Sequence, residues 1–281
     1  MSFTAAQIQF LQRLVSEQPT RRRAGEVAST FCEHFKLGVA VGRSIEYREA
    51  DHKSAQSLLR AHDLPVDPLA PDATRADVAR YGGLSEKHFS QAPHAKSLAV
   101  KFVGKCALDG QSLVTPFGSH MIFYPETAMQ VTCDRLLLVE NLETFRCLED
   151  YRWVNYEGLS VMAVYRGDPS LSISDALQFV QCRAEAIWAF VDFDPAGLAI
   201  ANALHQERLE RIILPSVDWI SRAADSHRGR QLFADQVDQY GATLDASSHA
   251  KVRFWWQEMK HLRSAVTQER MRGAAWHSTC E

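Results

Sequence analysis

Short apolar runs alternate with amphipathic segments along the second half of the chain. The expected strands cover residues 136–140, 161–165, 186–191 and 211–214, and the expected helices cover 142–149, 172–183 and 198–204. Apolar runs of this length are typical of strands that are covered on both faces, and strands that alternate with helices form parallel sheets. The pattern therefore predicts an α/β fold with a parallel sheet and helices on both faces.

The first half of the chain has a more helical pattern. Apolar residues predict helices over residues 5–17, 21–35 and 49–62, a short strand over 44–48, and a proline-rich linker or surface excursion over 63–73. Residues 74–92 have the pattern of a helix, a turn and a second short helix, and strand-like pieces follow at 98–103 and 112–124. This order is the outline of a winged-helix module.

The change of pattern predicts two domains. Residues 1–130 are expected to form a mainly helical, winged-helix-like region for DNA binding or assembly, and residues 131–281 are expected to form the α/β domain with C-terminal helices. Within the second domain we expect a loop over 218–226 and helices over 230–240 and 247–270.

The amino-acid composition indicates a globular protein but does not distinguish among functional classes. Of the 281 residues, 46% are apolar and 23% are charged, which is ordinary for a globular protein with room for two cores. The six cysteines form no CxxC pair, so we expect reduced thiols. The chain contains no run of about 18 apolar residues that could span a membrane and no secretory signal at its start. A cytoplasmic location without membrane contact is therefore expected.

Three carboxylates at strand ends are the candidate chemistry. Asp192 and Asp194 follow the apolar run 186–191 and have the i, i+2 spacing that projects side chains to one side of a strand. Glu140 ends another apolar strand, so neighbouring strands would bring all three carboxylates to one edge of the sheet. Oxygen donors of this kind suit Mg²⁺ or Mn²⁺, and such a cation polarises a phosphate and activates water. We therefore assign Glu140, Asp192 and Asp194 as metal ligands and catalytic residues.

These acidic motifs resemble those of a Toprim domain over residues 134–215. LLLVENLETF carries Glu140, VYRGDPS places Gly167 after the second strand, and DFDPAGLAIA carries Asp192 and Asp194. The VENLETF and DPAG forms resemble more specifically the nuclease subunit of Wadjet or MksBEFG condensin-type plasmid-defence systems, the JetD/MksG group. That group is related to the A subunit of topoisomerase VI.

The resemblance implies metal-dependent cleavage or nicking of plasmid DNA, without sequence preference, by a subunit recruited to a condensin-like ATPase of the structural-maintenance-of-chromosomes (SMC) type. Glu269 resembles an acidic residue near the end of those proteins and is a further metal-ligand candidate. The chain has no GxxxxGK[ST] loop, so ATP use would belong to the partner. This interpretation is compatible with a homodimer.

DNA contacts would come from local basic residues, because the net charge is −3. The expected phosphate contacts are Arg21, Arg22, Arg23, Arg80, Lys87, Lys101 and Lys105. An ordinary solvated surface is the alternative for each of them.

Three other functions fit parts of the sequence. The DxD pair also occurs in haloacid-dehalogenase-like phosphatases, where the first Asp is a nucleophile, but here Pro195 and Ala196 follow the pair and two βα units precede it. A non-catalytic DNA-binding adaptor would keep the acidic edge without activity. A topoisomerase-like transesterase would need a tyrosine nucleophile, for which Tyr47 and Tyr81 are the N-terminal candidates. We prefer water as the nucleophile.

Overall fold

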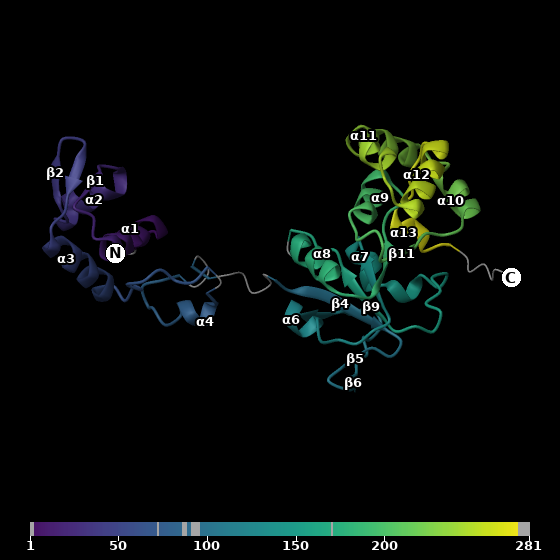
Figure 1. The fold of residues 1–281 in the computed structure, drawn as a ribbon, viewed down its shortest axis with the longest axis horizontal. Helices are drawn as coiled ribbons and strands as arrows, with labels where there is room; N and C mark the ends of the chain where they lie inside the picture. The colour runs from purple at the N-terminus through teal and green to yellow at the C-terminus, as the bar shows by residue number, and fades with distance from the viewer. Residues whose placement is uncertain (1–2, 72, 86–88, 91–95, 170, 275–281) are drawn as a thin grey trace. The chain divides into compact units, whose positions relative to one another are not determined.

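The protein forms two compact units, Met1–Ala95 and Lys96–Glu281, in a computed structural model (Figure 1). The structure describes residues 3–71, 73–85, 89–90, 96–169 and 171–274. The division falls between residues 95 and 96 rather than near residue 130, because the strands that follow residue 96 belong to the sheet of the second unit.

The N-terminal unit combines helices with a small antiparallel sheet of order β1-β3-β2. Its elements are α1 (Ala5–Glu17), β1 (Arg21–Arg23), α2 (Glu26–Phe35), β2 (Val39–Val41), β3 (Ser44–Glu46), α3 (Glu49–Ala61) and α4 (Arg75–Val78). Thr4 caps α1 in a capping box with Gln7, and the apolar face of α1 carries the fully buried Leu11 and Leu14. Phe10 stacks on Phe31 of α2 with ring centroids 5.3 Å apart.

The arginine triplet forms a strand and does not open a helix as expected. Arg21–Arg23 pairs antiparallel with Ser44–Glu46, so its side chains alternate between the two faces of the sheet. Helix α2 begins only at Glu26, after Gly25 as its N-cap. The strand depends on a partner more than twenty residues away, and the local pattern does not reveal that partner.

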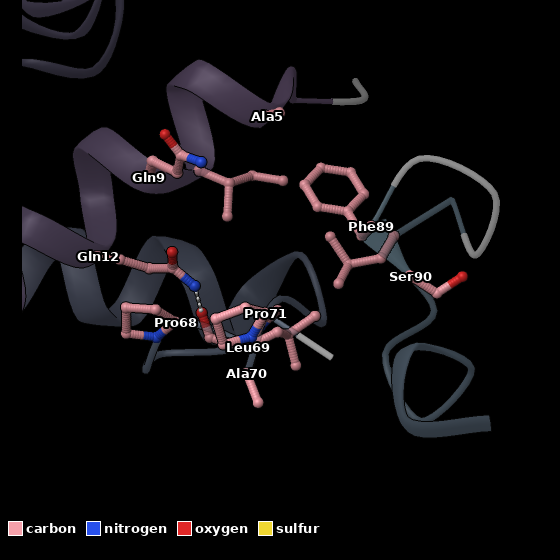
Figure 2. A pocket seen from close by; sticks show the side chains of 12 residues that line it. Ala5, Gln9, Gln12, Pro68, Leu69, Ala70, Pro71, Phe89 and Ser90 are labelled. Atoms are coloured by element: carbon pink, nitrogen blue, oxygen red, sulfur yellow. Dashed lines mark hydrogen bonds between the residues drawn. The ribbon is translucent and has the colours of Figure 1, made fainter. Parts of the chain in front are cut away.

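The proline-rich stretch packs against α1 instead of forming a free linker. The buried side chain of Gln12 donates hydrogen bonds to the carbonyl oxygens of Pro65 (2.9 Å) and Asp67 (3.1 Å). A pocket of about 370 Å³ lies between α1, this stretch and the segment that carries Phe89, as Figure 2 shows.

A six-stranded sheet of order β11-β10-β8-β9-β4-β7 organises the second unit. Its strands are β4 (Leu98–Val103), β7 (Met121–Phe123), β8 (Arg135–Val139), β9 (Val161–Tyr165), β10 (Ala186–Phe190) and β11 (Leu209–Ile212), and a separate hairpin joins β5 (Ala107–Leu108) to β6 (Gln111–Ser112). The four strands β11, β10, β8 and β9 are parallel, whereas β4 runs antiparallel to both of its neighbours. The α/β class is confirmed, with a mixed and mostly parallel sheet.

Strand β4 does not form the wing of a winged-helix module. Five of its six residues are buried, because β9 and β7 flank it and helices and loops cover the sheet. A wing would expose one face of such a hairpin to solvent. The second helix expected within residues 74–92 lies partly outside the described residues.

Helices cover the sheet, and α9 to α13 gather together on one side of it (green to yellow in Figure 1). The helices are α6 (Pro125–Ala128), α7 (Leu142–Arg146), the 3₁₀ turn Leu148–Asp150, α8 (Ile173–Cys182), α9 (Pro195–Asn202), α10 (Val217–Ala224), α11 (His227–Asp245), α12 (Ala250–Leu262) and α13 (Gln268–Met271). The loop expected over 218–226 is helical, because Ser216 caps α10 and Ile220 and Ala223 face the core. The single helix expected over 247–270 breaks after Leu262, where Arg263 adopts a left-handed conformation (φ 48°).

None of the helices in the described ranges combines the length and apolar character that a membrane span requires. The five cysteines within those ranges, Cys32, Cys106, Cys133, Cys147 and Cys182, are free thiols.

Candidate functional site

Glu140 and Asp192 meet at the carboxyl edge of two adjacent parallel strands. Strands β8 and β10 pair in register, with Val139 opposite Phe190. Glu140 directly follows β8, and its backbone N–H donates to the carbonyl of Phe190 (3.1 Å). The backbone N–H of Asp192 then donates to Oε2 of Glu140 (3.0 Å). The shared edge of the sheet therefore fixes the two carboxylates next to each other.

Asp194 is held differently from the other two carboxylates. It is the N-cap of α9, where Oδ1 accepts from the backbone N–H of Gly197 (2.7 Å). Its Oδ2 accepts from Nε2 of Gln236 on α11 (3.0 Å). Both oxygens of Asp194 thus accept hydrogen bonds, and its extended backbone (φ −145°, ψ 168°) leads directly into α9.

The C-terminal segment 266–271 lies against the same edge. Phe193 and Val266 exchange backbone hydrogen bonds of 2.9 Å in an isolated antiparallel bridge. The backbone N–H of Gln268 donates to Oδ1 of Asp192 (2.6 Å), and its buried side chain donates to the carbonyl of Phe190 (3.1 Å). The segment therefore holds Asp192 in position.

Glu269 is brought to the site by the same segment. Its Oε1 accepts a hydrogen bond from Nδ2 of Asn141 (2.7 Å), the residue that follows Glu140. The side-chain oxygen of Gln268 accepts from the backbone N–H of Asn141 (2.9 Å), which ties the segment to the end of β8. Glu269 itself is exposed, so its second oxygen remains open to solvent or a ligand.

Burial and mutual repulsion make these carboxyl groups resist ionisation. Burial, followed by the charge of Asp194, raises the pKa of Glu140 to about 7. Burial, followed by the charges of Glu140 and Asp194, raises the pKa of Asp192 to about 8. Burial also raises the pKa of Asp194. Carboxyl groups with such pKa values cluster at functional sites more often than elsewhere.

The carboxylates of Glu140 and Asp192 suit a divalent cation. Within the described ranges, no group of three or more His, Cys, Asp or Glu side chains is arranged to hold a metal ion. Glu140 and Asp192 each keep one oxygen that makes no hydrogen bond to the described part of the chain, whereas Asp194 keeps none. Mg²⁺ often binds through one or two carboxylates, retained waters and substrate phosphates. The pair fits such an ion, and the ligand role of Asp194 stays a prediction, because its oxygens also accept from Gly197 and Gln236.

A cleft of about 870 Å³ opens beside the carboxylate pair. Besides Glu140 and Asp192 it is lined by residues at the end of β9, on α7 and in the segments beside them, namely Asn141, Leu142, Glu143, Arg146, Cys147, Tyr165, Arg166, Gly167, Asp168, Pro169 and Ile173. Gly167 has φ +104°, and a Cβ there would lie 2.4 Å from the carbonyl of Leu171, so this turn requires glycine.

Several residues of the site were not identified from the sequence. Arg166 directly follows strand β9, so the strand-end rule that selects Glu140 also selects it. Tyr165 donates to Oδ2 of Asp168 (3.2 Å), and burial raises the pKa of its hydroxyl to about 12. Asn141 and Gln268 have no comparable signal, because their roles depend on a contact between distant parts of the chain.

The candidate phosphate contacts differ in accessibility. Lys101 is 1% exposed, donates to the carbonyl of Arg146 (2.7 Å) and pairs with Glu149 (2.7 Å), so its ammonium group is not available to DNA. Arg21, Arg23 and Lys105 are exposed, and Arg22 pairs with Glu17. Arg80 is exposed, and its Nη2 lies 3.7 Å from Oδ1 of Asp77. Lys87 lies outside the described residues.

The tyrosine candidates belong to the N-terminal unit. Tyr47 is 4% exposed, its hydroxyl has no hydrogen-bond partner in the described structure, and burial raises its pKa to about 12. A hydroxyl in that position cannot attack a phosphate without prior exposure. Tyr81 is partly exposed, in the turn after α4.

Comparison with known proteins gives a family without an assigned activity. No curated protein matches the chain. A family model described as Domain of unknown function (DUF7281) matches residues 95–275, which include the whole sheet, the carboxylate pair and the C-terminal segment. The chain therefore belongs to the DUF7281 family.

Proposed function

We propose that the cleft at the ends of β8, β9 and β10 is the active site of a divalent-metal-dependent DNA nuclease. The proposal rests mainly on the position, burial and raised pKa values of Glu140 and Asp192. The two carboxylates are adjacent and largely buried, their pKa values are raised to about 7 and about 8, and each keeps one oxygen without a hydrogen bond. A divalent cation removes the cost of placing two negative charges side by side.

The protein residues have separable tasks in this proposal. Glu140 and Asp192 hold the cation, and Glu269 is close enough for its charge to raise the pKa of both groups. Gln268 orients Asp192 through its backbone N–H, and Asn141 orients Glu269 through its side-chain amide. A bound Mg²⁺ or Mn²⁺ supplies the charge that polarises a phosphate and lowers the pKa of a water molecule.

A Toprim-type arrangement is part of the proposal. Three consecutive parallel strands, β8, β9 and β10, support it, because Glu140 follows the first, Gly167 follows the second and Asp192 follows the third. This order along the chain, with β8 between β10 and β9 in the sheet, agrees with the resemblance of the acidic motifs to Toprim domains.

DNA as the substrate and a condensin-like ATPase as the partner follow from the resemblance to the JetD/MksG group. Exposed Arg21 and Arg23 lie on the same face of the small antiparallel sheet, because they are two residues apart on β1. They are suited to phosphate contacts that do not depend on sequence. Because the sequence has no GxxxxGK[ST] loop, any ATP use in this proposal belongs to the partner.

Scission of supercoiled plasmid by the purified protein, alone and with the candidate partner complex, tests the proposal. We expect nicked or linear DNA with Mg²⁺ or Mn²⁺ and intact plasmid with EDTA. The products should carry free ends after denaturation, because the buried hydroxyl of Tyr47 is unsuited to forming a covalent link. A protein–DNA adduct that disappears on Tyr47→Phe or Tyr81→Phe substitution would favour a topoisomerase-like transesterase instead.

A further inference from the structure

Arg166 lies at the same edge of the sheet as Glu140. It directly follows strand β9, and its backbone N–H donates to the carbonyl of Val139 on β8 (2.9 Å). The residue lines the same cleft as Glu140 and Asp192. The guanidinium group is near enough for its charge to lower the pKa of Glu140, against the stronger effect of burial.

One donor of the Arg166 guanidinium group has no partner within the described part of the protein. Its Nε is buried and has no hydrogen-bond partner, and no described residue forms a hydrogen bond or an ion pair with the side chain. An unpaired buried donor destabilises the folded protein, because it has lost its hydrogen bonds to water. Elsewhere the chain avoids this cost: the buried guanidinium of Arg183 pairs with Glu185 and donates to three backbone carbonyls.

An anion with two oxygens in one plane is the ligand that best accepts hydrogen bonds from the guanidinium group of Arg166. A guanidinium presents its donors as a rigid fork that matches carboxylate and phosphate oxygens, and such charge-assisted bonds are about twice as strong as neutral ones. The carboxylate of Glu140 is close but forms no ion pair with Arg166. The donors of Arg166 are therefore available for a ligand beside the carboxylate pair.

We propose that Arg166 binds a phosphate of a nucleic-acid strand that lies in the cleft beside Glu140 and Asp192, the residues that would hold the cation. Arg146, which is exposed and lines the same cleft, binds the neighbouring phosphate of the strand. The inference rests on the proposed function for the identity of the ligand.

The charges around the cleft make this binding depend on the cation. Glu143 and Asp168 line the cleft together with Glu140 and Asp192, so carboxylates outnumber the two arginines. A divalent cation held by the carboxylate pair adds positive charge beside the two arginines and so attracts a phosphodiester. We therefore expect DNA affinity to rise when Ca²⁺ replaces EDTA in the buffer.

The experiment measures binding of a fluorescein-labelled single-stranded oligodeoxynucleotide by the full chain in Ca²⁺, using fluorescence anisotropy. Arg166→Gln should weaken binding by about 10-fold or more and reduce the slope of log affinity against log salt by about 0.7. Arg166→Lys, which keeps the charge but loses the fork, should lie between wild type and Arg166→Gln. The control is Arg228→Gln, an exposed position on α11 outside the cleft, and it should bind as wild type does.

Arg146→Gln gives an independent variant, because the side chain is exposed and its loss leaves the core intact. It should also lower the salt slope. Wild-type affinity and slope in Arg166→Gln would overturn the inference, as would failure of the wild-type protein to bind the oligonucleotide in Ca²⁺.

The outcomes separate this inference from the nuclease proposal. If Arg166→Gln loses binding while the wild-type protein cuts no DNA in Mg²⁺ or Mn²⁺, the phosphate site stands and the nuclease proposal fails. If the wild-type protein cuts DNA and Arg166→Gln both binds and cuts as well as wild type, the nuclease proposal stands and the role of Arg166 is wrong.

Discussion

The backbone N–H of Asp192 donates a hydrogen bond of 3.0 Å to the carboxylate of Glu140, across two adjacent parallel strands. The bond fixes the side chain of Glu140 beside that of Asp192 and uses only one of its oxygens. Two acidic groups are thereby held together in a largely buried place, where their ionisation is unfavourable without a counterion. This relationship has consequences for stability, metal binding and chemistry.

The first prediction concerns stability and pH. The pKa values of Glu140 and Asp192 are raised from 4.5 to about 7 and from 3.8 to about 8, so the folded protein holds protons that the unfolded chain releases. Without metal, these groups therefore lower the free energy of unfolding as pH rises from about 4 to about 8. Glu140→Gln keeps the acceptor for Asp192 and should raise the free energy of unfolding by about 2 kcal/mol at pH 8, with little change at pH 4.

Urea denaturation at both pH values measures this effect, with Glu207→Gln as an exposed control that should change stability little at either pH. If Glu140→Gln raised the free energy of unfolding no more at pH 8 than at pH 4, the fold would not raise the pKa of Glu140.

The second prediction concerns metal binding. Because a cation must displace the protons of Glu140 and Asp192, Mn²⁺ should raise the melting temperature more at pH 8 than at pH 6. Asp192→Asn should remove most of that increase, since it takes away a charged ligand. Thermal unfolding with and without MnCl₂ gives the comparison. Equal Mn²⁺ effects in wild type and Asp192→Asn would place the ion elsewhere on the protein.

The third prediction separates Asp194 from Asp192. Asp194 caps α9 and accepts from Gln236, so Asp194→Ala should cost about 1–2 kcal/mol of unfolding free energy through the lost cap. Asp194→Asn keeps an acceptor for the cap and should be less destabilising. If Asp194 is structural, Asp194→Asn should also retain far more metal binding than Asp192→Asn. Equal loss of Mn²⁺ binding in the two asparagine variants would show that Asp194 also binds the ion.

Much of the parallel sheet is predictable from the sequence because its signals are local. Residues 161–165 form β9 as expected, and the apolar runs before Glu140 and Asp192 form β8 and β10. Buried parallel strands are short apolar runs, and those runs identify them without knowledge of their partners. The same rule places Glu140 and Asp192 at one edge, and applied after β9 it also finds Arg166.

The features that the sequence does not predict depend on contacts between residues far apart in the chain. Strand β4 joins the sheet through β9, about sixty residues later in the chain, so residues 98–103 resemble a hairpin strand when taken alone. The contact between Gln268 and Asp192 spans 76 positions and leaves no mark on the local pattern. Asp194 has the extended backbone that its spacing predicts, but its contact with Gln236, 42 positions away on α11, has no local signal.

Plasmid scission by carboxylate variants tests the central claim most directly. Wild type, Asp192→Asn and Asp238→Asn are compared in Mn²⁺ and in EDTA, with Asp238 as an exposed carboxylate on α11. Loss of a ligand that also positions the cation should reduce scission by at least about 100-fold in Asp192→Asn. Asp238→Asn should cut as wild type does, and none should cut in EDTA. Scission by Asp192→Asn at the wild-type rate, or scission that persists in EDTA, would contradict the account.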